Sequence, residues 1–540
     1  MSYDIIIKNG RIIDGTGNPA YTSDIGIKHG KIEKIGYKLR NDANNSINAK
    51  GSIICPGFID IHSHTDYVLP LLSKVESTIQ QGITTQTIGM CGDGLAPLHP
   101  EKIEPIRDML TAQSSLYKEY EFIWNSFSEY LANMEAIRCP ANSVFFVGYG
   151  NIRIAGGQGF ENRPATKEEM EIMKGYLREA MQAGAFGMST GLIYPPQVYS
   201  STNELIELCK IVAEYGGLYF SHIRGEDENL LTAIKEFIDI VEKSNCSGGQ
   251  IAHFKVSGKK NWGISTQALK LVEDANLNGL NVTFDQYPYK RGMSNLPTAL
   301  PPWVLEGGRE KSLERIKEPT IQKKIINDIE KGIKGWENWI KNNGFDKLYI
   351  STAQTEKWKD IRGKSISQIT KIKGLNNDWE TFFQLLIDEN FDVMITIESM
   401  SDEDIERIMV NPFQMIGTDG AGVPANPMIG AVHPRLFGTY PRILARYVRE
   451  KQILNLEEAI RKMTSFPARK LGLRDRGLIY ANNWADIVVF NPETIRDKAT
   501  YDNPIQFPEG IMYVIVNGVI VVDHGKQKRK YPGKILRRTS

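Results

Sequence analysis

Short apolar runs separated by turn residues occur at both ends of the chain. The run Ile5–Ile7 precedes the turn pair Asn9-Gly10, and a longer apolar run near the C-terminus contains Asn517-Gly518. An Asn-Gly pair between apolar runs is typical of a β-hairpin. Because an open sheet edge invites unwanted pairing, the simplest arrangement joins the two ends of the chain in one small β-domain. We therefore expect a small β-sandwich domain formed by residues 1–56 and 476–540.

In the middle of the chain, amphipathic helices alternate with short strands that are apolar on both faces. A capping box at Thr166 and a second at Ser201 each begin a helix with apolar residues at helical spacing. The second helix ends before an apolar strand, Leu218–His222, and two further helix–strand units follow. Strands buried on both faces indicate a parallel sheet covered by helices. We expect an α/β fold in which residues 57–475 form a (β/α)8 TIM-type barrel; an open, doubly wound sheet is the alternative.

This alternation lapses between about residues 290 and 395. The sequence there is polar and rich in lysine and tryptophan, with helical character over 323–342, before a strand-like segment at Phe413–Asp419. About a hundred residues exceed the length of an ordinary connecting loop. We therefore expect a subdomain inserted late in the barrel, and closure over the site as a lid is one use for it.

Composition and charge narrow the function classes. The 540 residues are 41% hydrophobic and 24% charged, and 65 basic against 64 acidic residues leave a net charge of +1. This balance disfavours nucleic acid or a membrane surface as a partner, and the basic run Lys526–Lys530 is short enough to be ordinary solvated surface. The chain has neither an apolar stretch of about 18 residues nor an N-terminal signal-peptide pattern. Five cysteines without paired spacing indicate reduced thiols. We expect a cytoplasmic protein, with its oligomeric state left open.

Residues with metal-binding side chains stand at the ends of the predicted strands. His62 and His64 are two residues apart on a strand end, so their imidazoles point the same way and can converge on one ion. Two histidines hydrogen-bonded inside a core are the alternative interpretation. His222, His253 and Asp419 also stand at strand ends, and in a barrel these ends meet at the carboxyl face, where functional residues lie. The pattern therefore favours a metal site.

The segment Gly57–Asp66, which reads Gly-Phe-Ile-Asp-Ile-His-Ser-His-Thr-Asp after a β-rich leader, resembles the opening signature of the amidohydrolase superfamily. Within that superfamily, several further segments resemble the D-aminoacylase family, the N-acyl-D-amino-acid deacylases. They follow one another in the family's order and extend over nearly the whole chain. These segments are Thr87–Gly92, Gly187–Pro196, Ser221–Arg224, Asp285–Tyr289, His433–Arg442 and Ala485–Val488.

The resemblance implies a zinc site that contains a cysteine. Many dinuclear amidohydrolases bridge their metals with a carboxylated lysine on the fourth strand, but the corresponding strand here, Ala185–Ser189, has no lysine. The D-aminoacylases use a cysteine of the second strand instead, and Cys91 matches it; a thiolate is a good zinc ligand. By itself, Cys91 has the alternative role of a small buried apolar residue. The implied ligands are Cys91, His222 and His253 in one tightly binding site, and His62, His64, a bridging Cys91 and Asp419 in a second, weaker site.

The same resemblance implies roles in catalysis and substrate binding. Zinc activates a water molecule, and Asp419 matches the family's catalytic aspartate, which acts first as general base and then as general acid. A purely structural acid is the alternative for Asp419. An N-acylamino acid also carries a carboxylate, and Lys255, two residues after His253, points to the same side of its strand. The implied carboxylate-binding residues are Lys255, Tyr194 and Tyr287, with Arg224 and Arg435 as weaker candidates that otherwise brace neighbouring loops.

One position departs from the family's pattern. Tyr149 stands where the family usually has a histidine. This departure leaves open a substrate contact, or a supporting hydrogen bond, at that point, and it does not affect the zinc ligands. Asp66 and Asp285 stand close to other candidate residues, and we interpret both as supporting or structural residues.

Together, these features predict a hydrolase that uses zinc to cleave the linear amide bond of N-acyl-D-amino acids, releasing a carboxylate and a free D-amino acid. An L-specific or dipeptide-cleaving deacylase is a close alternative, since residue spacing does not reveal chirality. A cyclic amide hydrolase of the dihydroorotase or hydantoinase type is disfavoured by the missing lysine. An inactive amidohydrolase-like scaffold is disfavoured because every implied ligand and the acid are present. The expected partner is a small-molecule N-acylamino acid, with its side chain and acyl group left open.

Overall fold

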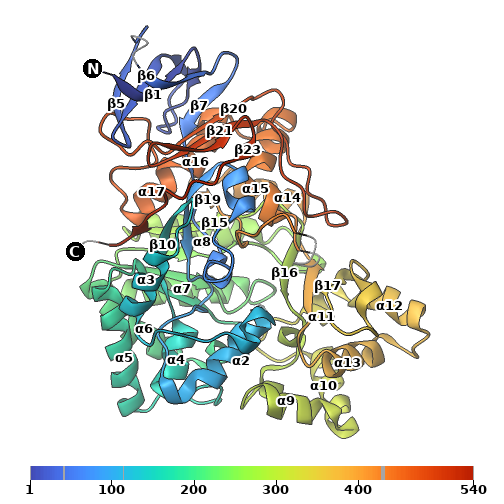
Figure 1. The fold of residues 1–540 in the computed structure, drawn as a ribbon. Coiled ribbons are helices and arrows are strands. Elements are labelled where there is room, and N and C mark those ends of the chain that lie inside the picture. Colours follow the sequence, from blue (N-terminus) through green and yellow to red (C-terminus); the bar gives the residue numbers. More distant parts are fainter. Residues whose placement is uncertain (1, 40–42, 114, 427–431, 539–540) are drawn as a thin grey trace.

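The computed structural model describes residues 2–39, 43–113, 115–426 and 432–538. Its centre is a set of parallel strands in two hydrogen-bonded sheets, with helices outside them (Figure 1). The sheet orders are β24-β10-β9-β8 and β11-β12-β13-β14-β15-β19. The strands are β8 (Phe58–Asp60), β9 (Ile83–Ile88), β10 (Asn142–Phe145), β11 (Val147–Gly148), β12 (Gly187–Gly191), β13 (Leu218–His222), β14 (Gly249–Ile251), β15 (Val282–Gln286), β19 (Gln414–Ile416) and β24 (Ile535–Leu536).

The two sheets are connected on both sides. On one side, β10 continues into β11 after the single residue Phe146. On the other side, the Asp419 N–H donates to the His62 carbonyl and the His64 N–H donates to the Gly420 carbonyl, each at 2.8 Å. These two bonds hold the chain segments that follow β8 and β19 beside each other.

Helices connect the parallel strands, as the capping signals predicted. Thr166 and Glu169 form a reciprocal capping box, and Ser201 accepts from the Glu204 N–H. No helix in the described ranges combines the length and apolarity needed to cross a bilayer. The helices of this part are α1 (Glu76–Gln80), α2 (Ile103–Gln113), α3 (Phe127–Ala136), α4 (Tyr149–Gly156), α5 (Lys167–Gln182), α6 (Thr202–Glu214), α7 (Leu230–Ser244), α8 (Ser265–Leu277), α14 (Asp402–Met409), α15 (Arg435–Arg442), α16 (Leu456–Met463) and α17 (Ser465–Leu471).

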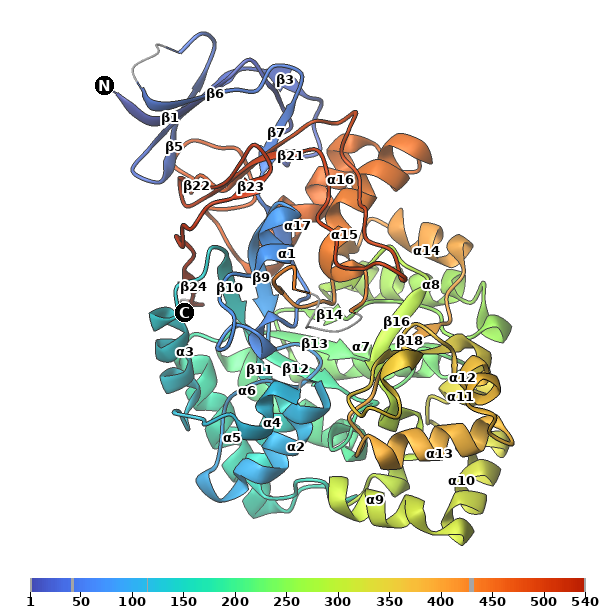
Figure 2. The same ribbon diagram turned by 45° about the vertical axis from the view of Figure 1, so that its right-hand side comes forward.

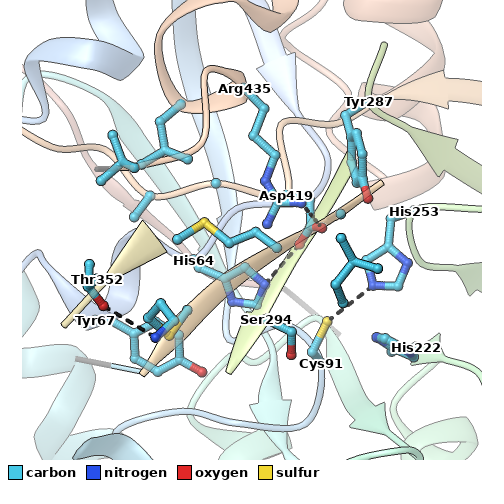
Figure 3. A pocket seen from close by; sticks show the side chains of 18 of the residues that line it. His64, Tyr67, Cys91, His222, His253, Tyr287, Ser294, Thr352, Asp419 and Arg435 are labelled. Carbon is cyan, nitrogen blue, oxygen red and sulfur yellow. Dashed lines mark hydrogen bonds and ion pairs between the residues drawn. The ribbon is translucent and has the colours of Figure 1, made fainter. Parts of the chain in front are cut away.

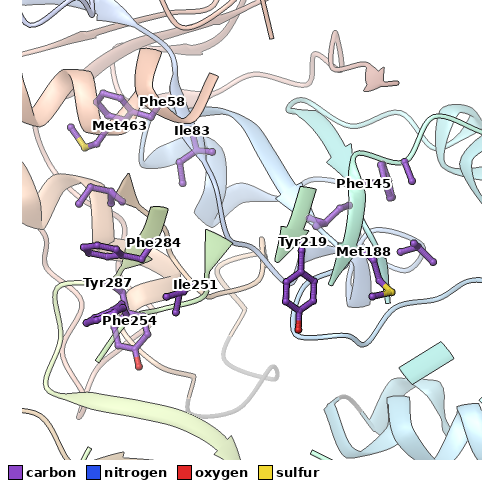
Figure 4. Packing of buried hydrophobic residues seen from close by; sticks show 14 of the residues in the cluster. Phe58, Ile83, Phe145, Met188, Tyr219, Ile251, Phe254, Phe284, Tyr287 and Met463 are labelled. Atoms are coloured by element: carbon purple, nitrogen blue, oxygen red, sulfur yellow. The ribbon is translucent and has the colours of Figure 1, made fainter. Parts of the chain in front are cut away.

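Apolar side chains of the strands and the surrounding helices pack together in a continuous cluster (Figure 4). Phe58 of β8 stacks on Tyr440 of α15 with 5.3 Å between ring centroids, and Phe254 contacts Phe284 of β15 at 4.6 Å. Fully burying a side chain of this size stabilises the fold by about 1.5–3 kcal/mol. The packing therefore gives the strand ends, and the polar residues that follow them, fixed positions.

The two ends of the chain share a sheet, as the turn pattern predicted (Figure 1). Strand β7 pairs antiparallel with β20. Asn517 and Gly518 have φ values of 47° and 76°, the left-handed conformation that a tight hairpin requires. The terminal sheets have orders β5-β4-β1-β6 and β23-β22-β21-β20-β7-β2-β3, whereas β24 pairs with β10. Their strands are β1 (Tyr3–Lys8), β2 (Arg11–Ile12), β3 (Tyr21–Thr22), β4 (Asp24–Lys28), β5 (Lys31–Gly36), β6 (Ala43–Asn48), β7 (Ile53–Pro56), β20 (Ile487–Phe490), β21 (Ile511–Val516), β22 (Val519–Asp523) and β23 (Lys526–Gln527).

Residues 291–398 have a sheet and an apolar core of their own, shown in green to orange-yellow in Figure 2. The core contains Trp336, Trp339 and Trp358. The helix expected over 323–342 is interrupted, because α10 ends at Gly332, whose φ is 86°. The antiparallel sheet of order β16-β18-β17 was not expected. The elements are β16 (Arg291–Asn295), α9 (Arg309–Lys317), α10 (Pro319–Lys331), α11 (Trp339–Asn343), β17 (Leu348–Thr352), α12 (Ile366–Lys373), α13 (Asp378–Asp388) and β18 (Met394–Glu398).

Candidate metal centre

His62 and His64 follow β8, and both face Asp419. The Nε2 atoms of His62 and His64 lie 3.2 and 3.1 Å from Asp419 Oδ1. His62 is fully buried, and its Nδ1 is 3.0 Å from Asp285 Oδ1. Since a carboxylate only accepts hydrogen bonds, the bond to Asp285 places a proton on His62 Nδ1 and leaves Nε2 facing the centre. The structure thus has the two imidazoles converging, as their spacing suggested.

Cys91 follows β9 in a tight turn that aims its thiol at the histidines (Figure 3). Its φ is 54°, and Gly89 and Gly92 on either side have φ values of 77° and 74°. Its Sγ lies 3.6 Å from His62 Nε2 and 3.8 Å from His253 Nε2. Burial raises the pKa of the Cys91 thiol well above its ordinary range. A thiolate here therefore needs a cation beside it.

Among the described residues, two groups of candidate ligand atoms share Cys91, and a third consists of His222, Glu226 and Glu337; within each group the atoms lie within 4.8 Å of one another. Both ring nitrogens of His222 are buried without a hydrogen-bond partner among the described residues, an arrangement that is costly unless something else binds them. Burial lowers the pKa of His222 and of His253 well below the usual value, so both are neutral, the ligating form. Sulfur and imidazole donors suit zinc, so the residues present fit that ion. The two groups that share Cys91 are His62, His64, Cys91 and Asp419, and Cys91, His222 and His253.

Asp419 is held in its ionised form by positive charge. Its Oδ2 is 2.7 Å from Nη1 of Arg435, and in Figure 3 the carboxylate lies between Arg435 and His64. Burial alone raises the pKa of Asp419, but Arg435 and then the neighbouring histidines lower it, and the net pKa is well below its usual value. Asp419 is therefore a carboxylate at neutral pH and is able to accept a proton.

A cavity of about 530 Å³ opens over the two ligand groups. Of the predicted substrate-binding residues, Lys255, Tyr194, Tyr287 and Arg435 line it. The Tyr194 ring is 5.1 Å from the His222 ring, and the Arg435 guanidinium lies over the Tyr287 ring at 4.8 Å. Apolar side chains complete the wall, among them Val68, Leu72, Met293, Met394, Ile397 and Leu436.

Arg224 is not among the described residues that line this cavity, so its role as a substrate contact stays a prediction. Its guanidinium binds the carboxylate of Glu236, with Nε 2.9 Å from Oε2, and donates to the carbonyls of Val198 and Ser200. These contacts engage all three guanidinium nitrogens and tie the loop after β12 to α7. These contacts are those of the loop-bracing role that the sequence left as the alternative.

Tyr149 also lies outside the described lining of the cavity. Its hydroxyl donates to Glu204, which in turn pairs with Arg153 at 3.1 Å. All three side chains are buried. The tyrosine therefore belongs to an internal charged cluster that joins α4 to α6, which answers the question its position raised.

The sequence interpretation missed the carboxylates of Asp93, Glu226, Glu337 and Asp392, which line the cavity. Glu226 has its Oε1 2.5 Å from Lys255 Nζ, and Glu337 comes from the unit formed by residues 291–398. Glu226 stands four residues after His222, a local signal that was available. Glu337 had no such signal, because the contact that brings it to the site spans 111 residues.

Buried imidazoles, a shared thiol and a carboxylate at the carboxyl ends of parallel strands define a metal-dependent hydrolytic site. The sequence model of the amidohydrolase family matches residues 45–522. The chain belongs to the amidohydrolase family.

Three relatives cover the full length of the chain. The D-aminoacylase of Alcaligenes xylosoxydans xylosoxydans is 31% identical and spans 100% of this chain and 98% of its own. A D-aminoacylase structure concerned with its binuclear metal centre, with one-metal activation and second-metal attenuation, is 30% identical with a TM-score of 0.81 and spans 99% of this chain and 100% of its own. The N-acyl-D-glutamate deacylase of Bordetella bronchiseptica, complexed with zinc and a phosphonate mimic of the tetrahedral intermediate, is 29% identical with a TM-score of 0.82 over the same shares.

Proposed function

We propose that this protein is a zinc-dependent N-acyl-D-amino-acid deacylase, which hydrolyses the linear amide bond to a carboxylate and a free D-amino acid. The observation that carries this proposal is the thiol of Cys91, which belongs to both ligand groups beneath the cavity. Full-length similarity to a D-aminoacylase with a binuclear metal centre and to a zinc-containing deacylase supports it.

The proposed architecture is a closed (β/α)8 barrel over residues 57–475, with an insertion at about 290–395 and a β-sandwich from 1–56 and 476–540. Taking β10 and β11 as one interrupted strand, the described parallel strands within residues 57–475 number eight, and β24 from outside that range pairs with β10. The bonds between the segments that follow β8 and β19 support closure. The apolar cluster of Ile5, Ile27, Ile54 and Ile487, drawn from both terminal sheets, supports the sandwich.

The proposed metal ligands are Cys91, His222 and His253 for one tightly bound zinc ion, with a second, weaker site at His62, His64, Cys91 and Asp419. The second site is weaker because the carboxylate of Asp419 is already paired with Arg435. When bound, zinc acts as a Lewis acid toward water and toward the scissile carbonyl.

The protein's own groups perform the proton transfers. Asp419, ionised by its pairing with Arg435, takes the proton of the attacking water as general base. It then gives that proton to the departing amine nitrogen, because an amine leaves poorly unless it is protonated. Asp285 keeps His62 in the tautomer that presents Nε2. Lys255, Tyr194 and Tyr287, which line the cavity, bind the substrate carboxylate.

A panel of substrates tests this proposal. The zinc-loaded protein is offered matched N-acetyl-D- and N-acetyl-L-amino acids, an L-dipeptide, dihydroorotate and a hydantoin, and its metal content is measured after gentle purification. We expect bound zinc and turnover of the D series. Faster turnover of the L series or the dipeptide refutes the stereochemical assignment, and faster turnover of a cyclic amide refutes the linear-amide assignment. Protein that binds no zinc refutes the enzyme proposal.

A further inference from the structure

Glu226 stands between a proposed zinc ligand and a proposed substrate-binding lysine. Its Oε1 lies 3.0 Å from His253 Nδ1 and 2.5 Å from Lys255 Nζ, and the residue is only 5% exposed. Lys255 Nζ is itself 2.8 Å from His253 Nδ1. The Glu226 carboxylate, the Lys255 ammonium and the His253 imidazole thus lie within 3.0 Å of one another. The position of the imidazole proton determines whether Nε2 of His253, which faces the metal centre, has a lone pair.

Two tautomers of His253 compete at this point. An ammonium group only donates hydrogen bonds, so Lys255 alone favours a His253 ring whose Nδ1 accepts and whose Nε2 carries the proton. That ring has no lone pair at Nε2, the atom that faces Cys91 at 3.8 Å. Glu226 only accepts, so it favours the other tautomer, with the proton on Nδ1 and the lone pair on Nε2. Glu226 therefore selects the ring that can bind a metal through Nε2.

The same centre already contains one such arrangement. Asp285 Oδ1 lies 3.0 Å from His62 Nδ1, while His62 Nε2 faces Cys91 Sγ at 3.6 Å. No lysine competes for His62 Nδ1 among the hydrogen bonds of the described residues. Glu226 is placed at His253 as Asp285 is at His62, with an oxygen 3.0 Å from Nδ1, but the hydrogen bond present at His253 Nδ1 comes from Lys255. Binding of a metal through Nε2 requires that Nδ1 turn from Lys255 to Glu226 as its partner.

Glu226 is held in place by the unit formed by residues 291–398. Its backbone N–H donates to Glu337 Oε2 at 2.8 Å, and Glu337 Oε1 accepts from Trp339 Nε1 at 2.7 Å. The next residue, Asp227, accepts from the side chain of Asn342 at 2.8 Å. Two consecutive residues of the loop after β13 are therefore fastened to the inserted unit, which forms a wall of the cavity at this point.

We propose that Glu226 is a positioning residue that holds His253 in its zinc-binding tautomer and orients the Lys255 ammonium, and that Glu337 of the inserted unit fixes Glu226 for this task. The proposal rests on the proposed function only in assigning zinc and the substrate carboxylate to these groups. Lys255 has three N–H donors, and Glu226 takes one of them, so donors remain for a carboxylate.

The test measures the zinc affinity of the full-length apoprotein by competition with a chromogenic chelator, a readout independent of turnover. Glu226→Gln keeps the size of the side chain and loses its charge, and we expect zinc binding about 10- to 100-fold weaker. Lys255→Met alone should leave zinc affinity within about twofold of wild type and raise KM. Combining the two removes the competing donor, so zinc affinity should return to within about threefold of wild type while KM stays high.

The double variant separates a tautomer effect from general damage. Wild-type zinc affinity in Glu226→Gln overturns the positioning role, and a double variant as weak as Glu226→Gln overturns the tautomer explanation. Glu337→Gln can accept only one of its two bonds and should weaken zinc binding about 3- to 10-fold; no change in either zinc affinity or KM overturns the role of the inserted unit. Glu236→Gln, which removes a carboxylate outside the cavity, is the matched control and should stay within about twofold. If wild-type protein binds zinc but cleaves no N-acyl-D-amino acid, the proposed function fails while the zinc series still tests Glu226.

Discussion

Gly92, beside the shared cysteine, gives the most specific prediction. A Cβ at this position would lie 2.5 Å from Cδ of Gln197, well inside contact distance, and the φ of 74° is strained for any L side chain. The Gln197 carboxamide accepts from the Gly191 N–H and donates to the Cys91 carbonyl and to Asp93. Gly92→Ala therefore moves the group that ties the turn of Cys91 to the end of β12.

The expected loss of folding stability follows from these contacts. The left-handed conformation costs an alanine about 1–2 kcal/mol, and each hydrogen bond lost from Gln197 costs about 0.5–1.5 kcal/mol. Loss of all three gives a destabilisation of roughly 3–6 kcal/mol. Since Cys91 shifts with the turn, zinc affinity should fall at least about tenfold.

Gly94→Ala is the matched control, because the nearest atom to its Cβ is Asn151 Oδ1 at 3.6 Å. Thermal unfolding of the apoproteins and chelator competition for zinc measure the two effects. We expect Gly92→Ala to unfold at a lower temperature and to bind zinc weakly, and Gly94→Ala to match wild type in both. Gly92→Ala with wild-type unfolding and zinc binding would show that the turn tolerates a side chain and that Gln197 does not position Cys91.

Three further predictions concern the ligands, acid pH and the buried charges. Cys91→Ala should lose zinc and activity more severely than His64→Ala, because Cys91 belongs to both ligand groups; zinc content and kcat/KM of the two variants check this, and a Cys91→Ala protein that keeps both contradicts the ligand assignment. Burial lowers the pKa of His222 well below its usual value of 6.5, so the unfolded chain binds more protons below that pH. The unfolding temperature of the apoprotein should therefore fall as the pH drops below about 6.5, and a constant value between pH 7 and 5 opposes it. Arg153→Met leaves the buried charge of Glu204 without its cation and should cost about 3–5 kcal/mol in unfolding free energy, with kcat/KM of the folded protein unchanged; a large loss of kcat/KM would give this cluster a direct role in catalysis.

The sequence predicted those features that depend only on residues close together along the chain. Helix capping and tight hairpins need only local chain geometry, so the sequence indicates them directly. The structure contains the caps at Thr166 and Ser201 and the hairpin at Asn517-Gly518. The i, i+2 spacing of His62 and His64 was equally local, since strand geometry alone directs both side chains to one side. The helical segment expected over 323–342 is divided between α10, which Gly332 caps, and α11.

The assignment of Cys91 came from resemblance to a family, because no local pattern distinguishes a ligand thiol from a buried apolar one. Its distances to His62 and His253 became visible only when the ends of β8, β9 and β14 were brought together. The partners of Arg224 were hidden from the sequence for the same reason. The guanidinium of Arg224 forms an ion pair with Glu236 of α7, a contact that the order of the residues does not show.

The sequence alone thus determined which chemical groups are available and at which strand ends they stand. The tertiary structure decided which of these groups remain free to act. Lys255 is paired with Glu226, Asp419 is paired with Arg435, and Glu226 is fastened to Glu337 across 111 residues. The physical reason is that hydrogen bonds and ion pairs act over a few ångströms. Packing of segments far apart in the chain sets those distances, and the order of the residues does not display them.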